Sequence, residues 1–102
     1  MRGLLESLRV ALAENGEVEL AVRVEDALDG PDQELEDFLV SNSLWGGSGS
    51  IADQAGLPRS EARSIIETAL IELGEQQLET GVVNPRTAMW VEAFRKWRDQ
   101  GI

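Results

Sequence analysis

The sequence contains no cysteine, histidine or tyrosine and only one lysine, Lys96. Without cysteine the chain can form no disulfide, no thiolate nucleophile and no Cys-ligated metal site. Without histidine and tyrosine it also lacks side chains that commonly shuttle protons or act as nucleophiles in enzymes. A pair of carboxylates could still perform acid–base chemistry, but no recognisable catalytic arrangement of acids stands out. We therefore expect a protein that is not an enzyme and needs no cofactor.

Long apolar runs are missing as well. A helix that crosses a bilayer needs about 20 predominantly apolar residues, and no stretch of this sequence approaches that length. The first residues also lack the apolar core of a signal peptide, because Glu6 and Arg9 interrupt it. These features predict a cytoplasmic protein with no membrane segment.

What is present fits one globular domain. The chain has 102 residues, of which 42% are hydrophobic and 27% charged. Both the length and the composition are typical of a single folded unit. We expect one domain that spans residues 1–102.

Apolar residues recur at the spacing of three and four that is typical of helices. This pattern predicts helices over residues 4–12, 31–39, 51–55, 62–80 and 85–98, with glycine or proline at most of the breaks. Residues 18–24 alternate as in a strand but also fit a helix over 18–28, which we favour because no second strand could pair with them. The predicted fold is an all-α, compact bundle of about five to six helices.

The net charge of −10 is unevenly distributed. Between residues 14 and 37, ten acidic residues accompany a single basic one, Arg23. Such a field repels nucleic acid and anionic lipid and accelerates encounter with a basic partner, although an acidic surface can also serve solubility alone. The spacing of the acids does not match that of a calcium-binding loop, so we predict no metal site. The candidate partner-binding residues are Glu25, Asp26, Asp29, Asp32, Glu34, Glu36 and Asp37.

Residues 41–50 read SNSLWGGSGS and are the only stretch rich in glycine and serine. Within and just after it, Ser50 and Asp53 resemble a capping box that starts the helix at 51–55. Backbone N–H groups of such a loop could cradle an anion, but no P-loop lysine follows. We expect instead that Trp45 is buried and anchors the turn. The residues singled out here, as structural or functional, are Trp45, Gly46, Gly47, Gly49, Ser50 and Asp53.

Residues 51–66 resemble the helix-turn-helix of bacterial repressors. The similarity lies in a small residue in the first helix, Gly56 in the turn, and Ala62 and Ile65 as apolar residues that would hold the second helix. The net negative charge opposes DNA binding, which depends on neutralising phosphates. The side chains that would face a major groove are Arg59, Ser60, Glu61, Arg63 and Ser64.

Residues 38–53, which read FLVSNSLWGGSGSIAD, also resemble the signature of a small bacterial family of unknown function. Its members carry an LWGG-x-GS-IAD core, a later helix, and a terminal helix with Trp and Phe like residues 90–97. The resemblance covers about the last two-thirds of the chain. It implies a bacterial origin and carries no function or site residue.

Taken together, these features predict a small acidic protein-interaction module of a bacterial cytoplasm. In its sharpest form this is an immunity or inhibitor protein that masks a basic partner. One alternative is a DNA-binding regulator built on residues 51–66. Another is a small-ligand or anion binder at the glycine loop that follows Trp45.

Overall fold

Helices make up most of the chain described by the computed structural model, which covers residues 1–55 and 61–100. No strand occurs within these ranges, so the predicted all-α fold is confirmed. The six predicted helices are all present, and a single-turn helix, α4, is added to them. In chain order the helices are α1 (Arg2–Glu14), α2 (Val18–Asp29), α3 (Asp32–Leu39), α4 (Asn42–Trp45), α5 (Ile51–Ala55), α6 (Glu61–Thr80) and α7 (Thr87–Asp99).

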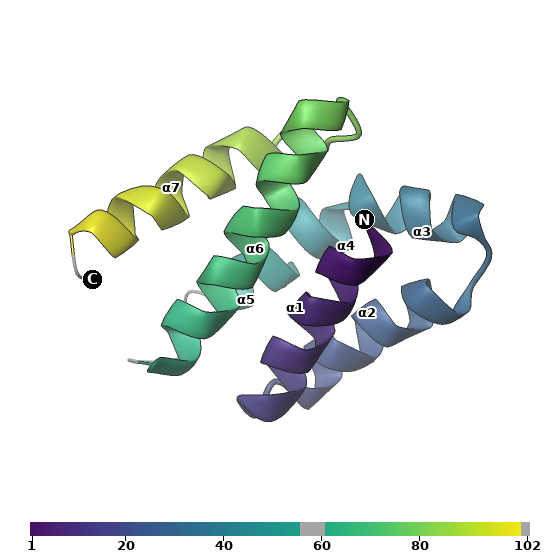
Figure 1. Cartoon of the computed structure of the whole chain (residues 1–102), viewed down its shortest axis with the longest axis horizontal. Helices are drawn as coiled ribbons and strands as arrows, with labels where there is room; N and C mark the ends of the chain where they lie inside the picture. Colours follow the sequence, from purple (N-terminus) through teal and green to yellow (C-terminus); the bar gives the residue numbers. More distant parts are fainter. Residues whose placement is uncertain (56–60, 101–102) are drawn as a thin grey trace.

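Helix α1 lies between α2 and α6 and contacts both (Figure 1). Its apolar stripe of Leu5, Leu8 and Leu12 has no exposed surface. The turn between α1 and α2 passes through Gly16, whose φ of 86° is a conformation that other residues rarely adopt. The first two helices therefore form a hairpin, and α6 packs against its α1 side.

The ambiguous segment 18–24 belongs to helix α2. Leu20 and Val24 face the core, whereas Val18 and Val22 are exposed. Each pair is four residues apart, so the two pairs lie on different faces of one helix. The apparent alternation thus comes from two apolar stripes and not from a strand.

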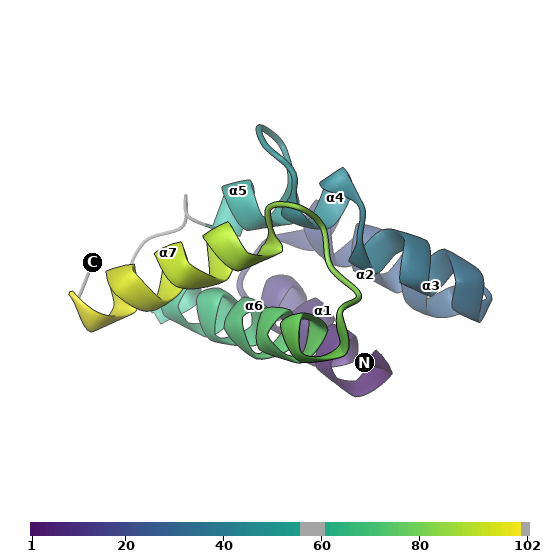
Figure 2. The same ribbon diagram turned by 90° about the horizontal axis from the view of Figure 1, so that it is seen from above.

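Helix α6 is the longest and contacts α1, α5 and α7. Helix α7 lies along α6 on the side away from α2 and α3 (Figures 1 and 2). Gly74 permits this approach, because a Cβ atom there would collide with Val91 of α7 and lie 3.1 Å from the Trp45 ring. The prediction that Ile65 is an apolar packing residue of this helix is wrong. Ile65 is 50% exposed, and its neighbour Ile66 is buried instead.

The last helix begins at Thr87, slightly later than the Asn84-Pro85 signal predicts. Asn84 forms a turn first: its side-chain oxygen accepts a hydrogen bond from the Arg86 N–H at 2.9 Å. The Asn84 N–H in turn donates to the Thr87 hydroxyl oxygen at 3.0 Å. The start signal therefore marks the turn that leads into α7.

Candidate functional site: the groove between helices α2 and α3

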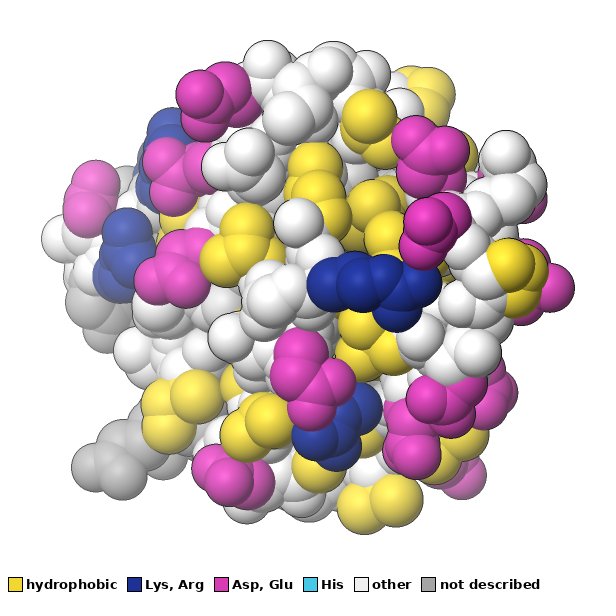
Figure 3. Space-filling view, turned by 45° about the vertical axis from the view of Figure 1, so that its right-hand side comes forward, with side chains coloured by type: hydrophobic (Ala, Val, Ile, Leu, Met, Phe, Trp, Pro, Cys, Tyr) yellow, Lys and Arg dark blue, Asp and Glu magenta, His cyan; other side chains and the backbone are white. Residues whose placement is uncertain are grey.

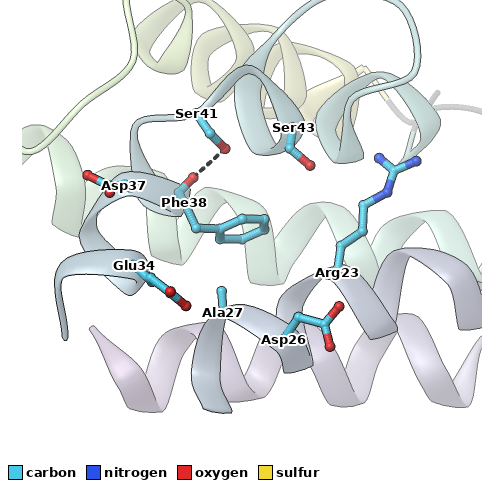
Figure 4. Close-up of a pocket in the computed structure, with 8 residues that line it drawn as sticks. All are labelled: Arg23, Asp26, Ala27, Glu34, Asp37, Phe38, Ser41 and Ser43. Carbon is cyan, nitrogen blue, oxygen red and sulfur yellow. Dashed lines mark hydrogen bonds between the residues drawn. The ribbon is translucent and has the colours of Figure 1, made fainter. Parts of the chain in front are cut away.

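A groove that is open to solvent runs between α2 and α3 and ends at α4, with a volume of about 350 Å³ (Figure 4). Arg23, Asp26 and Ala27 line it from α2. Glu34, Asp37 and Phe38 line it from α3, and Ser41 and Ser43 from the start of α4. We call this surface the α2–α3 groove.

Helical spacing explains why these side chains share the groove. On α2, positions 23, 26 and 27 are three and four residues apart, as are positions 34, 37 and 38 on α3. Residues with this spacing lie on one face of a helix. The sharp link at Gly30-Pro31 turns the chain back, so that the two faces come together. The groove is thus produced by the way in which two neighbouring helices pack.

The ring of Phe38 occupies the middle of the groove (Figure 4). The helical spacing of Leu35, Phe38 and Leu39 predicts that all three are buried, but Phe38 is only partly buried and packs against the edge of the core. Ala27 lies beside it on α2. An apolar floor is therefore accessible to solvent between charged side chains.

The seven predicted acidic residues are all exposed, but the structure does not bring them together on one surface. Asp26, Glu34 and Asp37 line the α2–α3 groove. Asp32 instead forms an ion pair with Arg2 of α1, at 2.9 Å. Glu36 lies outside the groove.

Glu25 and Asp29 lie on another side of α2, near Arg9 of α1. The pKa of the Arg9 guanidinium is raised above its ordinary value, mainly by its hydrogen bond with Glu6 and further by the charges of Glu25 and Asp29. The acidic segment is therefore not one continuous face. Only its groove-lining part is combined with an apolar surface.

Carboxylates dominate the charge of the groove. Among the described residues, none of the ion pairs within 4.0 Å involves Asp26, Glu34 or Asp37. Asp37 accepts a hydrogen bond from the Gln33 side chain at 3.0 Å, which turns it toward the outer side of α3. On the face shown in Figure 3, acidic side chains are spread over the surface and outnumber the basic ones, and apolar side chains remain visible between the charges.

Of the described residues that line the groove, Arg23 alone carries a positive charge. Its guanidinium donates a hydrogen bond to the Gly49 carbonyl oxygen at 2.9 Å, so it reaches across to the glycine loop. Sequence reasoning included the acids of this site but missed Arg23, Phe38, Ser41 and Ser43. The spacing of Arg23, Asp26 and Ala27 could have indicated that they share one face of a helix. The packing of α3 and α4 against that face could not be predicted from local sequence.

The glycine loop closes on itself. The Gly49 N–H donates to the Asp53 carboxylate at 3.0 Å, and the Ser50 N–H donates to the Gly47 carbonyl oxygen at 3.1 Å. The Ser50 hydroxyl oxygen accepts from the Asp53 N–H at 3.1 Å, as the predicted capping box requires. These N–H groups are thus already bonded, and a carboxylate lies beside them. Both features oppose an anion site in this loop.

Trp45 is fully buried, as predicted, and its side chain is part of a buried hydrogen-bond network. Its indole N–H donates to the Gln77 side-chain oxygen at 2.9 Å. The Gln77 amide nitrogen donates to the carbonyl oxygens of Leu39 and Val82, each at 2.8 Å. The Trp90 indole N–H donates to the Trp45 carbonyl oxygen at 3.0 Å. Trp45 therefore joins α4 to α6 and α7, and sequence reasoning missed Gln77 as its partner.

The proposed helix-turn-helix is only partly within the described residues, since its turn and the side chains of residues 59–62 lie outside them. Arg63, one of the expected DNA contacts, lies 3.6 Å from the Glu67 carboxylate. Glu67 is buried, and one of its oxygens has no hydrogen-bond partner among the described residues. Burial raises the pKa of Glu67, although the charges of Arg63 and Arg98 act in the opposite direction. The start of α6 is therefore partly committed to interactions within the domain.

Within residues 1–55 and 61–100, no three acidic side chains come together as a metal ion would require. No helix in the same ranges combines the length and apolar character needed to cross a membrane. Comparison with known proteins finds no family model, no curated protein and no solved structure that matches the chain.

Proposed function

We propose that this protein is an interaction module that binds a basic protein partner through the α2–α3 groove. In the sharpest form of the proposal it is an immunity or inhibitor protein of a bacterial cytoplasm, and its acidic surface masks a basic protein such as a nuclease. The resemblance of residues 38–53 to a bacterial family supports the proposed origin.

One observation carries the proposal: the groove combines an apolar floor with carboxylates that have no ion-pair partner among the described residues. Asp26 and Glu34 border the Phe38 ring from two helices (Figure 4). A surface that served solubility alone would need neither the groove nor a half-buried aromatic ring within it. Interfaces typically combine buried apolar contacts with a polar or charged rim.

The charge of the whole chain supports the same partner. A net charge of −10 attracts a basic protein over a range of roughly 10 Å at ordinary ionic strength. Complementary charge raises the association rate and orients the two proteins as they meet. The same charge repels the phosphates of DNA, which weakens the case for a regulator built on residues 51–66.

The test measures binding of an immobilised arginine-rich peptide by the wild type and by two charge-reversed variants. The first variant, Glu34→Lys, Glu36→Lys and Asp37→Lys, changes α3. The second, Glu72→Lys, Glu79→Lys and Glu92→Lys, changes exposed positions of α6 and α7. Both variants have the same net charge, so long-range attraction is matched.

We expect the α3 variant to lose at least tenfold in affinity and the α6–α7 variant to lose much less. The wild-type association rate should fall steeply between about 50 and 200 mM salt. Equal losses in the two variants would reduce the acids to a general charge effect and contradict a specific groove. A sequence-specific shift of duplex DNA by the wild type would favour the regulator instead.

A further inference from the structure

The groove has an internal polarity that a uniformly acidic surface would lack. Arg23 is held at the end next to the glycine loop by its hydrogen bond to the Gly49 carbonyl oxygen. The Phe38 ring lies in the middle, and Glu34 borders the opposite end (Figure 4). A ligand therefore meets the positive charge of Arg23 with the Asp26 carboxylate beside it, then an aromatic ring, then the Glu34 carboxylate (Figure 4).

We infer that the groove receives a single arginine side chain of the partner, with its guanidinium on the Phe38 ring beside Glu34 and directed away from Arg23. This inference rests on the proposed function and specifies which group of the basic partner is recognised. The volume of about 350 Å³ lies at the low end of small-ligand sites, which commonly span roughly 300–1,000 Å³. That space suits one long side chain and not a folded element.

Arginine fits the three parts of the groove better than the other cations do. Its apolar stem can lie on Ala27 and Phe38, because long basic side chains bury their methylene groups while the charge stays exposed. Its planar guanidinium can stack on an aromatic ring and also form paired hydrogen bonds to a carboxylate. The ammonium of lysine is a compact, strongly hydrated charge that offers no such planar fork.

Arg23 gives the inference its most distinctive consequence. Although it lines the groove, its positive charge repels a guanidinium that enters at its end. Removal of this charge should therefore strengthen binding, whereas removal of Glu34 should weaken it. If the groove bound its ligand through apolar contacts alone, both changes would shift the affinity in the same direction.

The experiment titrates acetyl-Gly-Arg-Gly-amide into the protein and follows backbone amide signals by NMR. Matched peptides carry citrulline, which has the same shape without charge, or lysine. The variants are Arg23→Gln, Glu34→Gln and Phe38→Leu, with Glu36→Gln as the control on α3 outside the groove. Far-UV circular dichroism checks the fold of each variant, and the three Gln variants all keep the Phe38 side chain.

We expect the arginine peptide to shift signals of Phe38, Ser41 and Ser43, and to bind about three- to tenfold more tightly than the lysine peptide. The citrulline peptide should bind at least tenfold more weakly than arginine. Phe38→Leu and Glu34→Gln should each weaken arginine binding about two- to fivefold, Arg23→Gln should strengthen it about twofold or more, and Glu36→Gln should leave it unchanged.

Equal binding of the arginine and citrulline peptides would overturn the inference, as would weaker binding by Arg23→Gln. If those results appeared while the arginine-rich peptide was still captured in a salt-dependent way that required the α3 acids, only the arginine site would fail. If that capture were also absent, the proposed function would fail with it.

Discussion

The buried bond between Trp45 and Gln77 gives the sharpest test of how the domain is held together. The indole N–H donates to the Gln77 oxygen at 2.9 Å, and neither side chain has exposed surface. Trp45→Phe removes the donor while it keeps an aromatic ring. The Gln77 oxygen is then left buried without this partner, which typically costs about 1–3 kcal/mol. The smaller ring also leaves a cavity, so we expect a total loss of about 2–4 kcal/mol in unfolding free energy.

Gln77→Leu should cost more than Trp45→Phe. Gln77 also donates to the carbonyl oxygens of Leu39 and Val82, so its loss leaves three polar groups without this partner. We expect a loss of about 3 kcal/mol or more. Trp45→Ala should be at least as severe, because truncation of a buried Trp commonly costs about 3–5 kcal/mol.

The double variant Trp45→Phe with Gln77→Leu isolates the bond itself. Each single change deletes the same hydrogen bond, so the combined loss should be about 1 kcal/mol or more below the sum of the two. Urea unfolding followed by far-UV circular dichroism measures all four proteins without relying on tryptophan fluorescence. A cost below about 0.5 kcal/mol for Trp45→Phe, or strict additivity, would refute the assignment of Trp45 as a hydrogen-bonded anchor.

Two further predictions concern α6. Gly74→Ala should destabilise the domain by about 1–3 kcal/mol in urea unfolding, because the added methyl group collides with Val91. This loss should outweigh the helix preference of alanine. Gly3→Ala is the control: its methyl group meets nothing within 4 Å, so the change should be neutral or stabilising by up to about 1 kcal/mol. A stabilising Gly74→Ala would show that α6 and α7 are not in close contact there. Burial raises the pKa of Glu67 above 4.5, so the folded state binds the carboxyl proton more tightly than the unfolded state does. The stability that comes from this tighter proton binding is lost as pH rises through the folded pKa. Glu67→Gln should therefore raise the melting temperature at pH 7, with a gain that shrinks below about pH 4.5, and an unchanged or lower melting temperature at pH 7 would contradict a buried charge.

Local pattern was sufficient to predict the helices but not the way in which they meet. The period of three and four residues is written into each segment, so α1, α2 and α6 could be predicted from apolar spacing alone. The single turn of α4 was missed because a glycine- and serine-rich stretch is typical of a loop. Its helical turn is stabilised by burial of Leu44 and Trp45, which is a tertiary effect.

The candidate site shows the same division. Consecutive residues of a helix lie roughly 100° apart around its axis. A helical projection could therefore have shown that Asp26 and Glu25 face different sides of α2. The presence of Phe38 at the centre of the groove required knowledge of how α3 packs on α2. Gly74 and Gln77 gave no signal either, because an isolated glycine or glutamine in a helix has the same local pattern whether it faces solvent or another helix.

The hydrogen bonds of Trp90 have a consequence for folding during synthesis on the ribosome. The hairpin of α1 and α2 uses contacts close in sequence and can form early in synthesis. In contrast, the carbonyl oxygens of Trp45 and Gly46 accept hydrogen bonds from the indole of Trp90, which lies 45 residues after Trp45 and is synthesised later. These two hydrogen bonds can therefore form only after α7 has emerged from the ribosome.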